Sequence, residues 1–231
     1  ELEKLSGAIG KWVGKPLDVG DLQNAIRVHN RSRRLLQRVY QLRRSDPPAI
    51  TGAAAMKIVL SSMVMDKREH ATLLEEFLAH PPKGNGDGVR LMVVGTENDH
   101  IEVVDLIESL GGMVVVDDTC TGSRYFWNEV REDEDPLSAL VSFHLEKPPC
   151  PQRDTLLRYR IAHILELAKE YQVQGVVFLR QKFCDSFAIE VPVLQSAFSK
   201  EKIPNLVLEL DMRPPPGQFR TRVEAFLETF I

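Results

Sequence analysis

The second half of the chain contains four short apolar runs that alternate with longer segments of helical periodicity. Each run is continuous rather than alternating, which is typical of strands buried on both faces of a parallel sheet. The runs are residues 89–94, 113–116, 175–179 and 205–210, and the helical segments are residues 100–110, 154–172, 190–201 and 217–231. Because right-handed crossovers connect parallel strands, this order predicts an α/β fold: a doubly wound parallel sheet of four strands, or slightly more, with flanking helices.

A helical segment, residues 1–83, precedes this sheet. Apolar residues recur at helical spacing through residues 1–44, Pro47 and Pro48 interrupt the pattern, and residues 50–79 resume it. The run Pro-Pro-Lys-Gly-Asn-Gly-Asp-Gly at residues 81–88 predicts a linker. We therefore expect a helical part, residues 1–83, and a Rossmann- or flavodoxin-like domain, residues 84–231.

Charge and cysteine content exclude several classes of protein. The formal net charge is −4, so the chain as a whole has no basic excess with which to bind nucleic acid. No apolar run approaches the roughly 20 residues of a membrane span. The start, residues 1–15, does not resemble a signal peptide, and three widely spaced cysteines do not form a disulfide scaffold. We expect a cytoplasmic protein with reduced thiols.

Residues 1–44 are locally basic, with ten Lys and Arg residues against four acidic residues. A basic helix of this kind is most often a solvated surface. The alternative is a surface for an acidic partner or a phosphate-bearing ligand.

Unusual polar residues follow the predicted strands, where an open parallel sheet binds its ligands. The loops at these strand ends are residues 95–99, 117–127, 180–185 and 211–218. Two of the three cysteines, Cys120 and Cys184, fall in them, whereas Cys150 is expected on a connection away from the strand ends. We predict one shared cleft, whose candidate residues besides Cys184 are Asp118, Cys120, Thr121, Gly122, Ser123, Arg124, Gln181 and Asp185.

Each candidate has more than one interpretation. Asp117 and Asp118 predict either a proton-transfer pair, one member having a raised pKa, or the cap of the next turn. Gly122 and Ser123 are consistent with an anion site at a helix start or with a simple turn. Arg124 suits a carboxylate or phosphate ligand, or an ion pair inside the fold. The aromatic residues 125–127 favour core packing.

Two motifs are similar to those of the benzoyl-CoA reductase / 2-hydroxyglutaryl-CoA dehydratase family. They are Asp-Asp-Thr-Cys-Thr-Gly-Ser-Arg-Tyr-Phe-Trp at residues 117–127 and Gln-Lys-Phe-Cys-Asp at residues 181–185. Residues 30–53 and 217–228 resemble the family too, so the resemblance covers nearly the whole chain. Residues 95–99 and 125–130 resemble the cluster-bearing subunits of benzoyl-CoA reductase in particular.

The resemblance implies a cofactor and the place of one ligand. Members of the family hold a [4Fe–4S] cluster between two α/β domains, with two cysteine ligands from the N-terminal domain and one from the C-terminal domain. That last ligand corresponds to Cys184, whereas Cys120 lies in a family motif but is not implied as a ligand. The other ligands would lie outside this chain, in an N-terminal domain to which residues 1–83 would lead. This sequence departs from the family at residues 186–189, Ser-Phe-Ala-Ile, directly after the Cys-Asp pair.

The resemblance also implies a reaction and partners. The chain would be the C-terminal part of an iron–sulfur oxidoreductase subunit that passes low-potential single electrons to an aromatic acyl-CoA. Its partners would be a homologous cluster-bearing subunit and an ATP-hydrolysing activator, since this chain contains no Walker motif. The alternatives are a 2-hydroxyacyl-CoA dehydratase subunit, which is a lyase, and a non-catalytic α/β scaffold or ligand-binding subunit without a cluster.

Overall fold

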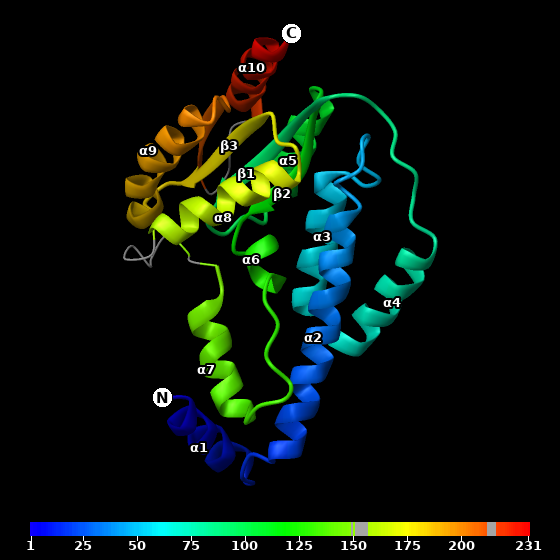
Figure 1. Ribbon diagram of the computed structural model, residues 1–231, viewed down its shortest axis with the longest axis vertical. Coiled ribbons are helices and arrows are strands. Elements are labelled where there is room, and N and C mark those ends of the chain that lie inside the picture. Colours follow the sequence, from blue (N-terminus) through cyan, green and yellow to red (C-terminus); the bar gives the residue numbers. More distant parts are fainter. Residues whose placement is uncertain (149, 151–156, 212–215) are drawn as a thin grey trace.

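A four-stranded parallel sheet lies at the centre of the upper part of the molecule in Figure 1. The computed structural model describes residues 1–148, 150, 157–211 and 216–231. The strand order is β2-β1-β3-β4, with every neighbouring pair parallel. The strands are β1 (Val89–Gly95), β2 (Gly112–Asp118), β3 (Gly175–Gln181) and β4 (Asn205–Leu210). Each predicted run lies inside one of these strands, so the predicted fold class is confirmed.

Helices cover both faces of the sheet. Successive strand residues point to opposite sides, so each strand contributes side chains to two core clusters. In β1, Leu91 and Val93 join one core cluster, while Met92 and Val94 join another. The first cluster includes side chains from α3 (Gly52–Val64), α5 (Ile101–Ser109) and α10 (Pro216–Leu227). The second includes side chains from α8 (Leu157–Glu170) and α9 (Asp185–Lys200). Burial on both faces explains the continuous apolar runs.

Helix α9 begins at Asp185, five residues before the predicted start at residue 190. The earlier start lets Phe187 continue the buried stripe of Val191, Leu194 and Phe198. Pro192, which usually favours the first turn of a helix, lies inside α9. The predicted helix at residues 217–231 ends as a 3₁₀ turn, Glu228–Phe230, and residues 154–156 of the predicted helix 154–172 lie outside the described residues.

Among the described residues between β2 and α8, where the sequence predicts no element, the chain forms α6 (Ser123–Phe126) and α7 (Pro136–Glu146). The side chain of Asp135 caps α7 by accepting a hydrogen bond from the Ser138 N–H at 3.0 Å. Helix α6 packs against β2 and against α2 (Val19–Gln41), so it joins the sheet to the preceding helices.

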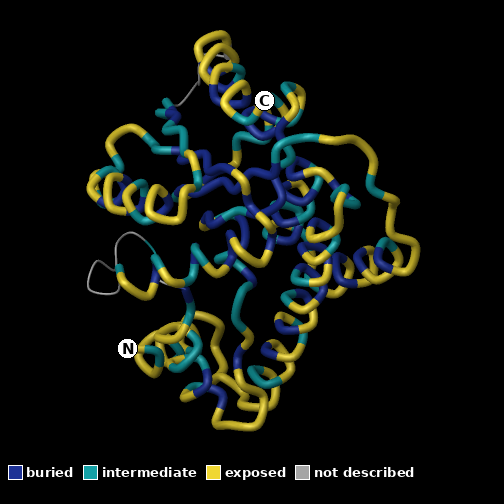
Figure 2. The backbone as a smooth tube through the Cα atoms, turned by 45° about the horizontal axis from the view of Figure 1, so that its top comes forward, coloured by how far each residue is buried: buried dark blue, intermediate teal, exposed yellow. Residues whose placement is uncertain are grey.

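The first 83 residues form the helices α1 (Leu2–Val13), α2 (Val19–Gln41), α3 and α4 (Lys67–Ala79). Helices α2 and α4 pack together, and α3 also packs on the sheet, where a side chain at Gly52 would meet Val114. Helix α1 has no buried residue (Figure 2). Residues 81–88 contain no helix or strand, as predicted, and the division of the chain at residues 83 and 84 stays a prediction.

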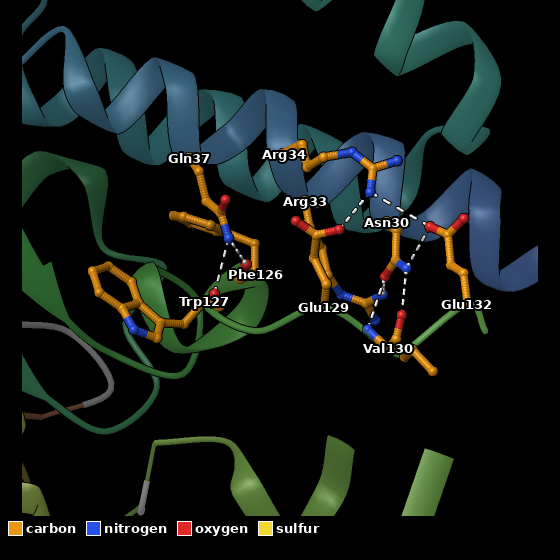
Figure 3. Close-up of polar contacts among 9 residues, drawn as sticks. All are labelled: Asn30, Arg33, Arg34, Gln37, Phe126, Trp127, Glu129, Val130 and Glu132. Atoms are coloured by element: carbon orange, nitrogen blue, oxygen red, sulfur yellow. Dashed lines mark hydrogen bonds and ion pairs between the residues drawn. The ribbon is translucent and has the colours of Figure 1, made fainter. Parts of the chain in front are cut away.

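The basic helix α2 contacts the acidic segment of the same chain that contains Glu129, Val130 and Glu132 (Figure 3). Asn30 exchanges two hydrogen bonds with the backbone of Val130, at 2.7 and 3.0 Å. Arg34 pairs with Glu129 and lies 3.4 Å from Glu132. Part of the basic surface of α2 is thus paired with acidic residues of the same chain. Across the described residues, no helix is both long and apolar enough to cross a membrane.

Candidate functional site

The carboxyl edge of the sheet contains a topological switch point between β1 and β3. From β1 the chain crosses to β2 on one side, and it then returns past β1 to β3 on the other. The loop after β1 leads to α5 on one face of the sheet, and the loop after β3 leads to α9 on the opposite face. Diverging loops of this kind leave a crevice in which doubly wound folds bind their ligands.

Cys184 lies at this switch point, in the N-cap position of α9. It is half-buried and contacts the core cluster of α8 and α9, and its backbone N–H donates to the Gln181 carbonyl at 3.2 Å. Helix α9 is 16 residues long, and the N-terminal end of a helix favours negative charge. The Cys184 thiol is therefore held at a strand–helix junction, at the positive end of the helix dipole.

Hydrogen bonds connect the loops after β1, β2 and β3. The Gln181 side chain donates to the Glu97 carbonyl at 3.4 Å, and the Cys120 N–H donates to the Thr96 carbonyl at 2.7 Å. Thr121 donates to the Asn98 carbonyl at 2.6 Å. Candidates from two predicted loops thus lie along one edge, while Asp185 is exposed in the first turn of α9. Residues 212–215 of the fourth loop lie outside the described part, and the shared cleft stays a prediction.

Asp118 is the centre of a buried ionic network. Its fully buried carboxylate lies 2.7 Å from Arg124 and 2.6 Å from Arg160. Arg160 in turn lies 2.8 Å from the carboxylate of Glu190 on α9. The network links the end of β2 to α8 and α9, and it supports the ion-pair interpretation of Arg124.

The two carboxyl groups of the network have opposite pKa shifts. Burial favours the neutral acid at Asp118, but Arg124 and Arg160 outweigh it and hold the pKa of Asp118 below its usual value. At Glu190, burial raises the pKa although Arg160 opposes the change. Asp118 is therefore a permanent anion near neutral pH rather than a proton donor.

Asp117 has a separate role, because adjacent strand residues point to opposite faces. Its carboxylate accepts hydrogen bonds from Tyr40 on α2, from Thr119 at 3.1 Å and from the Ser123 N–H at 2.9 Å. A side chain at Gly122 would come within 1.7 Å of this carboxylate, so glycine is needed there. The turn-capping interpretation is confirmed for Asp117, whose own carboxylate takes the Ser123 N–H that an anion would use.

Two thiols lie near Arg124. The exposed Cys120 accepts a hydrogen bond from Arg124 at 3.3 Å, and the same guanidinium donates to the Gly95 carbonyl at 2.7 Å. Burial lowers the pKa of Arg124, but Asp118, Cys120 and Cys150 together raise it above its usual value. The position of Cys150 relative to the strand ends stays a prediction.

Arg160 and Glu190 were not among the sequence candidates, although both carry a signal. Arg160 lies on the same buried stripe of α8 as Ile164, Leu167 and Ala168. Glu190 lies on the buried stripe of α9 beside Val191 and Leu194. A charged residue within an apolar stripe indicates a buried partner of opposite charge.

A complete metal site is not found in the described residues, which contain no group of three or more His, Cys, Asp or Glu side chains placed to hold a metal ion. The carboxyl edge offers two thiols: the half-buried Cys184 at a helix start, and the exposed Cys120, which accepts a hydrogen bond from Arg124 of the buried ionic network.

The sequence matches the family described as "2-hydroxyglutaryl-CoA dehydratase, D-component" over residues 1–230. The chain belongs to this family. The D-component match covers both the helical part and the sheet, so the resemblance of the sequence motifs to benzoyl-CoA reductases and 2-hydroxyglutaryl-CoA dehydratases is confirmed.

Curated relatives of the chain include both reductase and dehydratase subunits. The (R)-phenyllactyl-CoA dehydratase beta subunit of Clostridium sporogenes is 27% identical over 99% of this chain and 60% of its own length. A benzoyl-CoA reductase subunit of Thauera aromatica is 27% identical over 88% of this chain and 55% of its own. The beta subunit of the (R)-2-hydroxyglutaryl-CoA dehydratase of Acidaminococcus fermentans is 26% identical over 98% and 62%. The chain thus spans about 60% of the length of these relatives.

Proposed function

We propose that this chain is the C-terminal part of an iron–sulfur subunit that passes low-potential single electrons to an acyl-CoA thioester, with Cys184 as one ligand of a [4Fe–4S] cluster. The observation that carries the proposal is the place of Cys184 at the switch point, in the N-cap position of a 16-residue helix. The names of the relatives, all subunits of enzymes that act on CoA thioesters, support the substrate class.

The residues present fit one ligand position of such a site. Thiolates are the usual ligands of iron–sulfur clusters, and Cys184 is a free thiol on a rigid strand–helix junction. The described residues contain no group of three or more side chains placed to hold a metal ion, and the proposal places the other ligands outside them. When bound, the cluster would supply one-electron chemistry. The protein's own contribution is the half-buried setting of Cys184 and the positive end of α9.

The partners follow from the same proposal. A homologous subunit would carry a second cluster, and an ATP-hydrolysing activator would deliver the electrons. The absence of a Walker motif from the sequence supports a separate activator. Like its proposed substrates, the complex would be cytoplasmic.

The cluster assignment is tested by replacing Cys184 in the natural protein, purified anaerobically with its accompanying subunits. We expect Cys184→Ala to lower bound iron and to abolish turnover. Cys150→Ala, the matched change at another half-buried thiol, is expected to do neither. Full iron occupancy in the Cys184 variant would overturn the assignment.

The reaction has two candidates because relatives of both kinds share 27% identity with the chain. We place reduction of an aromatic acyl-CoA first, on the resemblance of residues 95–99 and 125–130. Dehydration of a 2-hydroxyacyl-CoA is the second candidate, supported by the two dehydratase relatives. Incubating the activated complex with benzoyl-CoA and, separately, with phenyllactyl-CoA distinguishes them by which thioester disappears.

A further inference from the structure

Arg33 on α2 differs from the arginine beside it, because it forms no ion pair in the described part of the chain. Its neighbour Arg34 pairs with Glu129, although Glu129 also attracts Arg33. The half-buried Arg33 guanidinium donates to the Asn30 side chain at 3.0 Å and lies over the Phe143 ring, 4.7 Å from its centroid. Its remaining N–H groups have no acceptor among the described residues, so most of this charged fork is open to a ligand.

A second cation of this kind, Lys67, lies at the start of α4. It too forms no ion pair with any residue that the structure describes. The Lys67 ammonium donates to the Ser62 carbonyl and, at 2.7 Å, to the hydroxyl oxygen of Tyr125 on α6. One of its three N–H groups is left over, and the Tyr125 hydroxyl, which accepts from Lys67, keeps its own hydrogen to donate.

His29 and Tyr125 show that the two cations lie close together. Burial lowers the pKa of His29, and both Arg33 and Lys67 lower it further. Tyr125, which is hydrogen-bonded to Lys67, also interacts electrostatically with Arg33. His29 and Arg33 are four residues apart on α2 and therefore share one face of the helix, and α2 contacts both α4 and α6. We call Arg33, Lys67, Tyr125 and His29 the donor cluster.

Positive charge is in excess around the donor cluster, although the net charge of the chain is −4. Burial lowers the pKa of His144 on α7, and Lys147 and Arg33 lower it further. Burial also lowers the pKa of His70 on α4, and Lys67 adds to the effect. Neighbouring cations thus disfavour protonation of histidines on α2, α4 and α7. A positive local potential of this kind attracts an anion.

The chemistry of the donor cluster suits a phosphate group. Its guanidinium, ammonium and hydroxyl groups all offer hydrogens, and the imidazole of His29 can offer another. A phosphate ester has nearly two negative charges and three acceptor oxygens, and an arginine fork can bind two of these oxygens at once. A carboxylate has only one charge and two oxygens, so it would leave one of the two cations without compensation.

We propose that Arg33, Lys67, Tyr125 and His29 bind a phosphate group where α2, α4 and α6 meet. Two sources share this chemistry. One is a CoA thioester, the class of compound for which the relatives are named, and in that case the site extends the proposed function to substrate binding. The other is free phosphate, and in that case the site is independent of the proposed function.

The site is located by modifying the complete natural protein with diethyl pyrocarbonate, which reacts with accessible imidazole nitrogens. Mass spectrometry gives the rate at each histidine. We expect saturating inorganic phosphate to slow the modification of His29 several-fold, and to leave the exposed His80 at the end of α4 unchanged. A His29 that reacts at one rate with and without phosphate, or that reacts in neither condition, overturns the site.

The source of the phosphate is read from the concentration that half-protects His29. Adenosine 3′,5′-bisphosphate, which resembles the phosphorylated end of CoA, should protect at a concentration about tenfold below that of inorganic phosphate if the substrate is the source. Equal concentrations identify free phosphate as the ligand. Protection of His29 by neither compound overturns the site.

Two variants on different helices test the donors. Arg33→Gln and Lys67→Gln each remove one charged donor, so each should raise the half-protecting phosphate concentration about tenfold or more. Arg38→Gln on α2 and Lys57→Gln on α3, at exposed positions, are the matched controls and should leave it unchanged. Wild-type protection of His29 in either donor variant that keeps the thermal midpoint of the wild type overturns the site.

Bound iron and the protection of His29 are separate measurements, so the two proposals succeed or fail separately. Protection of His29 in an anaerobically purified protein without iron supports the phosphate site and overturns the cluster assignment. Iron without protection leaves the cluster assignment standing and overturns the phosphate site. Both donor variants should keep the iron content of the wild type.

Discussion

Two regions of the molecule hold opposite charges together, and they differ in their access to water. At the end of β2, the Asp118 carboxylate is 0% exposed and the Arg124 side chain 5%. Between α2 and the acidic segment, Arg34 is 48% exposed and Glu129 is 35%. Both regions connect segments distant in sequence, yet only the first has removed its charges from water.

This difference in exposure determines how much each region contributes to the stability of the fold. A buried charge loses its hydration, so each member of the Asp118 network depends on the others for compensation. An exposed charge keeps most of its hydration, so its loss changes little. We therefore expect the Asp118 network to define the geometry of the carboxyl edge. The exposed pairs should adjust the attachment of α2 only slightly.

The largest effect is expected at Asp118. Asp118→Asn keeps the shape of the side chain but leaves Arg124 and Arg160 without their shared anion. We expect a loss of about 3–5 kcal/mol in the free energy of unfolding. Urea denaturation measures it, with Asp105→Asn on the exposed side of α5 as the control, expected to stay within about 0.5 kcal/mol of wild type. If Asp118→Asn lost less unfolding free energy than substitution of the exposed pairs, the buried network would not be the more important of the two regions for stability.

The second largest effect tests whether the loss in unfolding free energy depends on the burial of the substituted residue or on the helix in which it lies. Asn30 lies in the same helix as Arg34, but it is buried, and it satisfies both backbone groups of Val130. Asn30→Ala leaves these groups without partners, so we expect a loss of about 1–3 kcal/mol. Asn24→Ala, the same change at an exposed position of α2, should be nearly neutral in the same denaturation experiment. Equal losses at the two positions would show that burial is not the deciding factor.

A third prediction concerns the pH dependence of the buried network. Burial raises the pKa of Glu190, so the folded chain holds this proton more tightly than the unfolded chain, where the pKa is about 4.5. As pH rises from about 4.5 through the folded pKa, ionisation of Glu190 lowers stability. The amide in Glu190→Gln does not ionise, so this variant should gain stability relative to wild type across that window.

The measurement for Glu190→Gln is the difference in unfolding free energy from wild type at pH 4 and at pH 7. The effect should be smaller than that of Asn30→Ala, because the amide oxygen can still accept a hydrogen bond from Arg160. Glu76→Gln, at an exposed position of α4, is the control and should show no such trend. A difference that stays constant with pH, or that falls, would contradict the raised pKa.

The two regions also differ in how far the sequence predicts them. Because each strand is buried on both faces, its sequence is a continuous apolar run. The sheet and its carboxyl edge can therefore be predicted from the sequence. The partners of Asp118 are not, because an apolar stripe shows which side of α8 is buried but not which strand end it meets. The contact between Asn30 and Val130 joins residues 100 positions apart and leaves no local pattern.

The surroundings of Cys184 show the same limit at shorter range. The motif at residues 181–185 identifies the position through the family resemblance, and the apolar run identifies the strand before it. The start of α9 at Asp185 is hidden by Pro192, which favours a later start. The N-cap position of Cys184, on which the proposed function depends, therefore came only from the structure.

The smallest effect is expected at the exposed pair of α2. Arg34→Ala removes the contacts with Glu129 and Glu132, and each of these side chains is at least one-third exposed. We expect a loss of about 0.2–1 kcal/mol, which salt should reduce further. A double-mutant cycle with Glu129→Ala isolates the pair from other effects of each substitution. A coupling energy as large as the loss at Asp118 would mean that Arg34 and Glu129 are shielded from water in the natural protein, where further polypeptide would then cover this side of α2.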